Sequence, residues 1–313
     1  MTNNKKLNFT SSQPLNTAVL FLVFNRLDTT KQVFESIRQA KPMKLYIAAD
    51  GARQIKEGEI EKVRAVRDYI TSNVDWKCDV KTLFREQNLG CKIAITEAID
   101  WFFENEEMGI ILEDDCLPNQ SFFRYQQDLL NYYKDDRRIM CISGNNFIEN
   151  KKVSFNSYDF SEITFIWGWG TWRRAWELNQ KSIANFENIK TQGITLSSNK
   201  KANKMWWSFV IKSYNNDIDT WDYIWSFANL INGGLTIIPD VNLVKNIGMG
   251  HIDGTHTINF NKNKIVENRE FNFPIAHPLY LKRNIINDNR LYKRNFRIMS
   301  IPEKIIHKLF ELF

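Results

Sequence analysis

The stretch Gly109-Ile110-Ile111-Leu112-Glu113-Asp114-Asp115-Cys116-Leu117-Pro118 decides the fold that we expect for this chain. Its first half is short and rich in isoleucine, which is typical of a strand buried in a parallel sheet. Its second half begins with three consecutive carboxylates at the carboxyl end of that strand, where ligands bind in open α/β sheets. Adjacent carboxylates repel one another, so we expect a positive or hydrogen-bonding group to compensate them. A solvated turn after a strand is the simpler alternative.

Strand and helix patterns alternate on both sides of this stretch. Short apolar runs predict strands over 17–24, 44–49, 78–82 and 139–143, and stripes of apolar residues at helical spacing separate them. This alternation predicts an α/β fold with a mostly parallel sheet flanked by helices. Further along, 235–239 reads as another strand, whereas the polar segment 185–203 has weak periodicity and reads as a loop.

The 313 residues are enough for one large domain with a substantial core. We divide the chain into a flexible tail (1–16), a nucleotide-binding half (17–150), an acceptor-binding and catalytic half of the same domain (151–265) and a basic, amphipathic extension (266–313). A hydrophobic content of 43% with 25% charged residues is ordinary for a folded soluble protein. The net charge of +6 suits an anionic ligand or an acidic membrane surface and specifies neither. We expect no nucleic-acid partner.

The cysteines and the apolar runs bear on the compartment. Cys78, Cys91, Cys116 and Cys141 have no metal-ligand spacing, which favours reduced structural thiols in a cytosolic protein. The run 18–24 follows two lysines, as in a signal peptide, but Asn25-Arg26 replaces a small-residue cleavage site. We therefore interpret 18–24 as the first strand and expect a cytoplasmic protein.

Polar groups follow three of the predicted strands: Asn25-Arg26, Asp50-Gly51 and Glu113-Asp114-Asp115. Right-handed connections place the carboxyl ends of parallel strands at one edge of the sheet. An arginine for phosphate, an aspartate for base or ribose and acids for a divalent metal together describe a nucleotide-diphosphate site. Mg²⁺ or Mn²⁺ prefers carboxylate oxygens and needs few protein ligands when substrate phosphates take part. Each residue alone could equally serve the fold.

The order of these segments resembles the GT-A fold of nucleotide-sugar glycosyltransferases, most closely the branch related to N-acetylglucosaminyltransferase I. Bacterial haemolysin-like nucleotide-diphospho-sugar transferases look similar. The resemblance covers roughly residues 17–260 and rests on the three strand ends, the aromatic run closing at Tyr125, Gly168-Trp169 with the downstream Trp176, and Trp221-Asp222-Tyr223-Ile224-Trp225. The aromatic run comes two residues later than in the family, and the last motif is one residue longer.

The resemblance implies a role for each matching residue. Asp115 would coordinate the metal, Asp114 would face the ribose or nucleotide, and Glu113 would face the transferred sugar. Asp50 would bind the base, and Arg26, with Asn25 beside it, would lie near the phosphates or hold Asp50. Asp222 would be the catalytic base of an inverting transfer, and a late histidine, His256, would complete the metal site.

Several of these candidates have alternatives in the sequence. Asp217 and Asp219 are rivals of Asp222 as the base, and all three could be solvated helix ends. Lys92 begins a predicted helix that could face phosphate, or it is an exposed lysine of a first turn. Trp169 could stack on a sugar ring, or it packs in the core.

The last predicted helix, 302–313, is amphipathic and has a cationic flank. It could lie on the inner face of an anionic membrane beside a lipid-linked acceptor. Packing against the domain, or pairing in a homodimer, explains the same apolar stripe, and we prefer that interpretation.

Together these observations predict a metal-dependent, inverting glycosyltransferase that moves a sugar from a nucleotide-diphosphate sugar to a glycan or glycolipid acceptor, in bacterial surface polysaccharide or glycolipid assembly. A sugar-nucleotide pyrophosphorylase is the first rival, although Val23-Phe24-Asn25-Arg26-Leu27-Asp28 lacks the glycine-rich phosphate loop that such an enzyme needs. A non-catalytic glycan-binding protein is the second rival. The complete acidic triplet argues against it.

Overall fold

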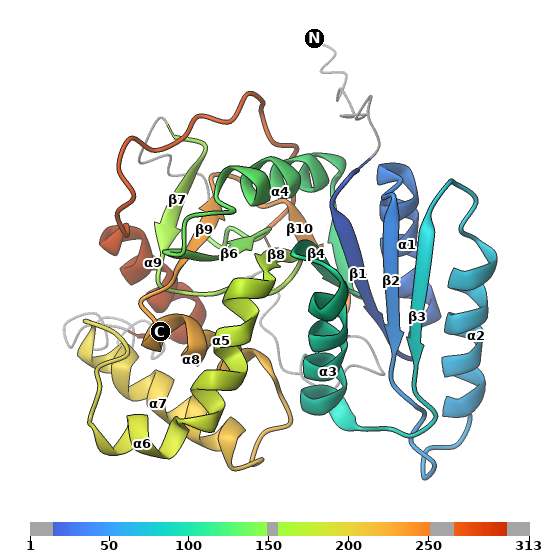
Figure 1. Cartoon of the computed structure of the whole chain (residues 1–313), viewed down its shortest axis with the longest axis horizontal. Coiled ribbons are helices and arrows are strands. Elements are labelled where there is room, and N and C mark those ends of the chain that lie inside the picture. The colour runs from blue at the N-terminus through green and yellow to red at the C-terminus, as the bar shows by residue number, and fades with distance from the viewer. Residues whose placement is uncertain (1–14, 149–155, 251–265, 299–313) are drawn as a thin grey trace, which may run out of the picture.

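The computed structural model describes residues 15–148, 156–250 and 266–298. Its centre is an eight-stranded sheet in the order β3-β2-β1-β4-β8-β6-β9-β7 (Figure 1). Six strands run in one direction, and β8 and β7 run in the other. The strands are β1 (Ala18–Val23), β2 (Lys44–Ala49), β3 (Asp79–Phe84), β4 (Met108–Glu113), β6 (Ile139–Ser143), β7 (Tyr158–Ser161), β8 (Trp169–Trp172) and β9 (Leu235–Pro239). The predicted α/β fold with a mostly parallel sheet is therefore confirmed.

Alternate residues of β1 face two helical layers, as the period of a strand requires. Val19, Phe21 and Val23 pack with the layer formed by α1, α2 and α4. Leu20 and Leu22 pack with the layer formed by α3, α5 and α8. The helices are α1 (Leu27–Ala40), α2 (Glu59–Ser72), α3 (Gly90–Asn105), α4 (Gln120–Tyr132), α5 (Arg173–Ala184), α6 (Phe186–Thr191), α7 (Lys200–Tyr214), α8 (Asp222–Ile231) and α9 (Ile285–Phe296).

The parallel strands end level with one another, and this places the candidate site. In the sheet, Val23 of β1 lies opposite Ala49 of β2, and Leu22 lies opposite Glu113 of β4. The segments that follow the three strands therefore start from one edge. A two-stranded sheet of β5 (Cys116–Pro118) and β10 (Val244–Asn246) then brings the distant segment around 248 to the acidic turn.

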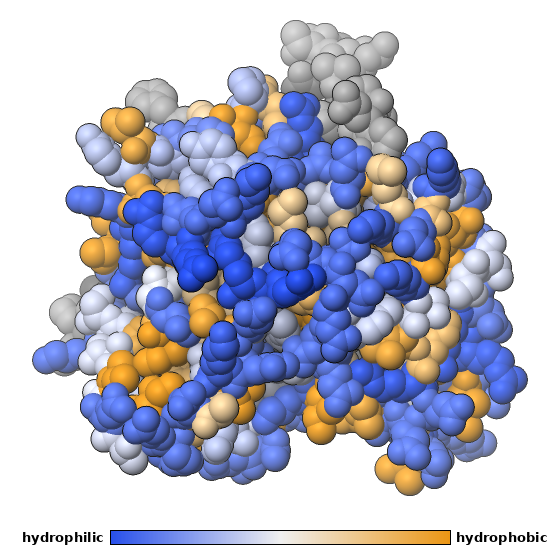
Figure 2. Space-filling model, in the orientation of Figure 1, coloured by the Kyte–Doolittle hydropathy of each residue, from blue (hydrophilic) through white to orange (hydrophobic). Residues whose placement is uncertain are grey.

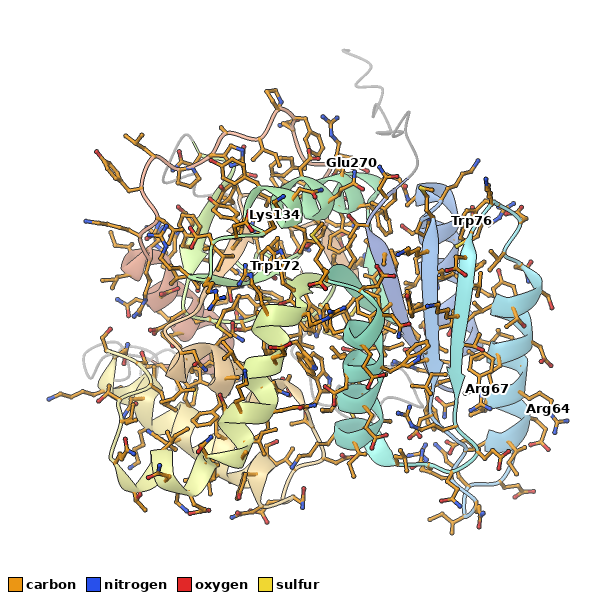
Figure 3. The ribbon with its side chains drawn as sticks, in the orientation of Figure 1. Arg64, Arg67, Trp76, Lys134, Trp172 and Glu270 are labelled. Atoms are coloured by element: carbon orange, nitrogen blue, oxygen red, sulfur yellow. The ribbon has the colours of Figure 1, made fainter. Side chains whose placement is uncertain are left out.

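A side chain from α2 ties the ends of two strands together. Arg67 lies between α2 and β3, whereas Arg64 lies on the outer side of the helix (Figure 3). The Arg67 Nη2 donates to the carbonyl oxygens of Asp50 (3.0 Å) and Arg85 (2.6 Å), the first residues beyond β2 and β3. Arg67 of α2 thus links the segments that follow β2 and β3 at the edge of the sheet that carries the candidate site.

The second half of the chain differs from the sequence expectation in one segment. Residues 185–203 are not a loop throughout, because they contain α6 and the first residues of α7. Phe186 of α6 is buried in a third apolar cluster, together with Trp206 and Val210 of α7. Contacts that are distant in sequence stabilise these helices, whose own sequence pattern is weak.

The extension that begins at 266 belongs to the same folded unit. α9 contributes Leu291 and Tyr292 to the third cluster, and Asn284 bonds through its backbone N–H to the Phe160 carbonyl oxygen at 2.8 Å. Buried ion pairs fix this arrangement: Arg283 pairs with both Glu162 and Asp288. The predicted helix 302–313, with its proposed membrane or dimer contact, lies outside the described residues.

The surface and the cysteines add two observations. The face shown in Figure 2 is largely hydrophilic, with hydrophobic side chains in small groups. Within the ranges that the structure describes, no helix is both long and apolar enough to cross a bilayer. All four cysteines are described, and none forms a disulfide.

Candidate active site

The acidic triplet at the end of β4 is compensated by one arginine from the segment after β1. Arg26 forms ion pairs with Asp114, through Nη2, and with Asp115, through Nη1 at 3.0 Å. The backbone N–H of Phe24 also donates to Asp114 Oδ2 at 3.3 Å. Among the described residues, none forms a hydrogen bond or an ion pair with the Glu113 carboxylate. The compensating positive group expected from the sequence is therefore Arg26, which forms direct ion pairs with Asp114 and Asp115 but not with Glu113.

Burial and mutual repulsion make this cluster costly to ionise. Burial raises the pKa of Asp114 to about 6, even though Arg26 lowers it. Burial, followed by the charges of Asp115 and Asp114, raises the pKa of Glu113 well above its usual range. The Arg26 guanidinium loses solvation, but its two acidic partners raise its pKa. The cluster holds more negative charge than one guanidinium neutralises.

This excess of charge fits a hard divalent cation. The backbone at Gly248 lies directly against the ion pairs, because a Cβ there would be 2.3 Å from Asp115 Oδ2 and 2.7 Å from Arg26 Nη1. Glycine at 248 thus keeps the Asp115 oxygen free of a covering side chain. Over the described residues, no three His, Cys, Asp or Glu side chains gather to hold an ion by themselves. Mg²⁺ commonly takes one or two protein carboxylates and completes its coordination with water and substrate phosphates. His256, the second predicted ligand, lies outside the described residues.

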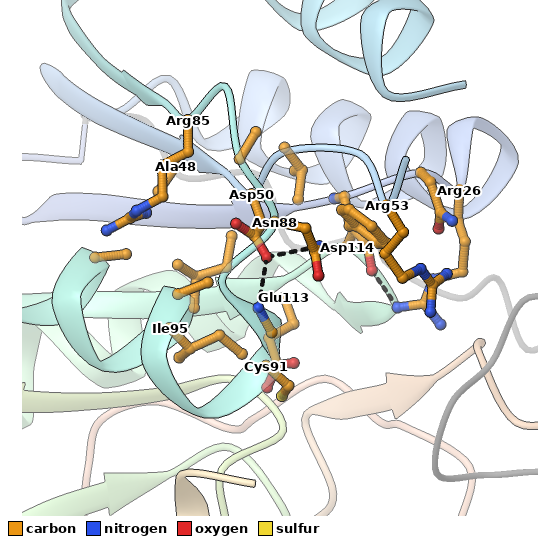
Figure 4. A pocket seen from close by; sticks show the side chains of 18 of the residues that line it. Arg26, Ala48, Asp50, Arg53, Arg85, Asn88, Cys91, Ile95, Glu113 and Asp114 are labelled. Carbon is orange, nitrogen blue, oxygen red and sulfur yellow. Dashed lines mark hydrogen bonds and ion pairs between the residues drawn. The ribbon is translucent and has the colours of Figure 1, made fainter. Parts of the chain in front are cut away.

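A cavity of about 290 Å³ lies against this cluster, at the carboxyl ends of β1, β2 and β4. We call it the strand-end cavity; its polar walls include Arg26, Asp50, Glu113 and Asp114 (Figure 4). Apolar residues of α3 complete it on the other side. The structure thus gathers most of the predicted polar groups around one space, although Asp115 is not among the residues that line it.

Asp50 is used mainly to hold the loop before α3. Its carboxylate accepts hydrogen bonds from the backbone N–H groups of Leu89 (3.0 Å) and Gly90 (3.1 Å) and from the Asn88 side chain (2.9 Å). Burial raises its pKa, and these backbone bonds lower it in part. Both of its oxygens already have donors, so a contact with a base would have to compete with them.

Asn25 is buried and also lines the strand-end cavity. Its Nδ2 donates to Glu59 Oε1 at 2.8 Å, and Glu59 also pairs with Arg53. Sequence reasoning did not select Arg53 or Arg85, although both line the strand-end cavity. Arg85 directly follows β3, so the rule that singled out the other strand ends could have found it.

Lys92, which was predicted to face phosphate, does not line the strand-end cavity. Its Nζ donates to the Ser213 carbonyl oxygen and to Asn216 Oδ1 (2.8 Å), near the end of α7, where the helix dipole favours a cation. Asp219 occupies the start of α3 instead, because its carboxylate accepts from the backbone N–H groups of Cys91 (3.0 Å) and Lys92 (2.9 Å). The structure gives Lys92 a bracing role in place of the predicted phosphate contact.

Trp169 packs in the core and does not stack on a ligand. It is 0% exposed, and its ring centroid lies 5.6 Å from those of both Trp221 and Trp225. A sugar ring cannot reach it, so the prediction that it binds substrate is wrong. Trp167, two residues earlier, is partly exposed and lines a different cavity.

That second cavity has a volume of about 270 Å³ and contains Asp222. We call it the aromatic cavity, because its walls include Phe147, Phe165, Trp167, Trp206, Tyr223 and Phe296. Asp222 is the first residue of α8 and accepts a hydrogen bond from the Thr220 hydroxyl. Its charge raises the pKa of both Glu113 and Cys91, which line the strand-end cavity. Asp219 lines the strand-end cavity, whereas Asp222, three residues further along the chain, lines the aromatic cavity.

The comparisons with known proteins leave the family open. No protein-family model matches the chain, and no curated protein matches its sequence. A structure of Staphylococcus aureus TarS 1–349 is similar with a TM-score of 0.34 and 11% identity over 56% of this chain and 49% of that one. The glycosyltransferase GlyE of Streptococcus pneumoniae TIGR4 is similar with a TM-score of 0.32 and 14% identity, over 69% of this chain and 43% of GlyE. The inositol-1-phosphate CTP transferase of T. maritima is similar with a TM-score of 0.39 and 10% identity, over 72% of this chain and 86% of the transferase.

This chain therefore spans about half the length of the TarS structure it matches. GlyE is a glycosyltransferase and the T. maritima protein is a CTP transferase, and likenesses at these identities and TM-scores decide nothing about the activity of this chain.

Proposed function

We propose that this protein is a glycosyltransferase that moves a sugar from a nucleotide-diphosphate sugar to a hydroxyl group of a glycan or glycolipid. The observation that carries the proposal is the strand-end cavity, which gathers Arg26, Glu113 and Asp114 at the carboxyl ends of parallel strands. Ligands bind at this edge in open α/β sheets. A donor sugar would lie at Glu113, and the acceptor hydroxyl would lie at Asp222 of the aromatic cavity.

The strand-end cavity would hold the donor. Asp114 would accept hydrogen bonds from the nucleotide, and Arg26 would pair with phosphate oxygens as well as with the acids. Asp50 would position the loop before α3, because its oxygens are already occupied. Asp115 would hold a bound Mn²⁺ or Mg²⁺, and His256 would complete its coordination, as the resemblance implies. The ion would supply Lewis-acid stabilisation of the leaving diphosphate.

Asp222 would be the base of an inverting, single-displacement transfer. Such a reaction needs one carboxylate to take the acceptor proton, on the side opposite the leaving group. Asp219, the rival base, has both oxygens bound to amides of α3 and is therefore a weaker candidate. Asp217 is exposed and lines neither of the two cavities.

The main rival activity is nucleotidyl transfer by a sugar-nucleotide pyrophosphorylase. That chemistry would need a phosphate-binding loop directly after β1, but α1 begins at Leu27 and no glycine lies between Val23 and Asp28. It would also leave the aromatic cavity without a role.

A screen for nucleotide release from UDP-, GDP- and dTDP-sugars, with and without Mn²⁺, tests the proposal. Asp115→Asn should abolish Mn²⁺ binding, measured by electron paramagnetic resonance, and weaken donor binding with it. Asp222→Asn should retain donor binding and lose transfer by about 10²-fold or more. Asp217→Asn is the matched control and should change neither.

Two outcomes would refute this proposal. The glycosyltransferase assignment fails if no nucleotide sugar binds or turns over with Mn²⁺ present. The assignment of Asp222 as the base fails if its variant loses donor binding.

A further inference from the structure

We infer that the aromatic cavity binds the acceptor as a single neutral sugar ring, and that α9 supplies part of its selectivity. This inference rests on the proposed function and names the class of acceptor for it. The cavity is built by segments far apart in sequence, from Asn145 through Asp222 to Phe296. Three properties of its walls carry the argument: volume, charge and the arrangement of rings.

The volume limits what can enter. At about 270 Å³ the aromatic cavity is just below the range of roughly 300–1,000 Å³ that is typical of small-molecule sites. It can accommodate one monosaccharide ring, whereas the remainder of a longer glycan would have to lie outside.

The charge of the walls selects a neutral ring. Of the described residues that line the cavity, Asp222 is the only charged one. A phosphorylated or acidic sugar would bring a second negative charge beside Asp222 with no arginine or lysine among these residues to compensate it. Neutral hydroxyl groups would instead find a carboxylate, the Asn145 and Asn295 amides and the Ser226 hydroxyl.

The rings of the cavity fit the apolar face of a sugar. The Phe147 ring packs edge-on against Trp167 (5.2 Å between centroids), and Tyr223 is stacked on Phe209 at 4.7 Å, so these rings are fixed before a ligand binds. Asn145 is buried, and its Nδ2 donates to the Val244 carbonyl oxygen at 3.4 Å, so its side chain is also held in place.

α9 forms one wall and is held firmly. The Phe296 ring lies 5.5 Å from Trp206, whose Nε1 donates to the Tyr292 hydroxyl at 2.9 Å. Tyr292 in turn donates to Glu162 at 2.8 Å, in the buried ionic network that includes Arg283. Because α9 is anchored in this way, Asn295 has a defined place in the cavity wall and can discriminate between hydroxyl arrangements.

Binding of simple probes tests the inference directly. Saturation-transfer NMR would compare methyl gluco-, galacto- and mannopyranosides with the 6-phosphates of the same three sugars, with the free nucleotide that the protein binds present. We expect at least one neutral glycoside to bind the intact protein and none of the phosphates to do so. Asn295→Ala should weaken that binding by about two- to tenfold, the worth of one hydrogen bond. Asn289→Ala is the control, because this exposed asparagine is on the same helix but does not line the cavity.

A second variant tests the charge argument. Asp222→Asn removes the repelling carboxylate and should allow the 6-phosphates to bind while the neutral glycosides still bind. The inference is overturned if the intact protein binds the phosphates as well as the neutral sugars, if it binds neither, or if Asn295→Ala and Asn289→Ala behave alike. Nucleotide-sugar binding is measured separately, so a failure here with donor binding retained leaves the proposed function standing.

Discussion

Replacing Glu59 by glutamine tests the buried support beneath the strand-end cavity. The Glu59 side chain is 0% exposed, and it accepts hydrogen bonds from the Arg53 backbone N–H (2.8 Å), the Arg53 side chain (2.8 Å from Nε) and Asn25 (2.8 Å). Burial by itself would raise the pKa of Glu59, but these donors outweigh it and lower the pKa from 4.5 to about 2. The Glu59 carboxylate is therefore a stabilising group in the folded protein.

The size of the effect follows from that shift. One pKa unit corresponds to about 1.4 kcal/mol, so the Glu59 carboxylate contributes roughly 3 kcal/mol to the free energy of unfolding at neutral pH. Because the folded-state pKa is the lower one, this contribution is present above pH 4.5 and is lost as the pH falls towards 2. Glu59→Gln should lower stability by a similar amount at pH 7, since it leaves Arg53 with a poorer partner.

Urea unfolding of the two proteins at several pH values would measure this. The stability gap between them should be widest near pH 7 and should narrow as the pH falls below 4.5. Glu61→Gln is a matched control, because Glu61 is in the same first turn of α2 but is exposed. A gap that does not change with pH, or an equal loss in the two variants, would refute the reasoning.

Three further predictions concern other parts of the molecule. Trp169→Ala should destabilise the fold by about 3–5 kcal/mol in denaturant unfolding, since the side chain is fully buried, and an unchanged midpoint would contradict this. Gly248→Ala should weaken Mn²⁺ binding in a calorimetric titration, because its Cβ would be 2.3 Å from Asp115 Oδ2; unaltered affinity would remove Asp115 as the ligand. Arg283→Gln leaves Asp288 buried without its cation, so hydrogen exchange in α9 should become faster, and unchanged protection would argue against the anchoring network.

The sequence by itself was sufficient to place the central strands and the acids that end them. The apolar run 109–112 could be recognised as a strand without any distant contact, because its composition and short length are typical of a buried strand. The alternation of strands and helices then fixes a parallel arrangement, and the parallel arrangement brings Arg26, Asp50 and Glu113 to one edge. Where the local pattern is weak, as in α6 and the start of α7, packing against distant residues decided the structure.

Tertiary structure alone decided which partner each polar side chain takes. A lysine at a helix start is compatible with phosphate, but only the folded chain shows that the end of α7 lies within its reach and that Asp219 occupies the helix start. Trp169 has the same sequence signal whether it stacks on a sugar or packs on Trp221 and Trp225. The aromatic cavity is lined by residues from Asn145 to Phe296, and no local sequence pattern predicted that these residues would enclose one space. The physical reason is common to the three cases: hydrogen bonds, ring contacts and enclosed volume depend on distances in space, and local sequence constrains those only within one helix or strand.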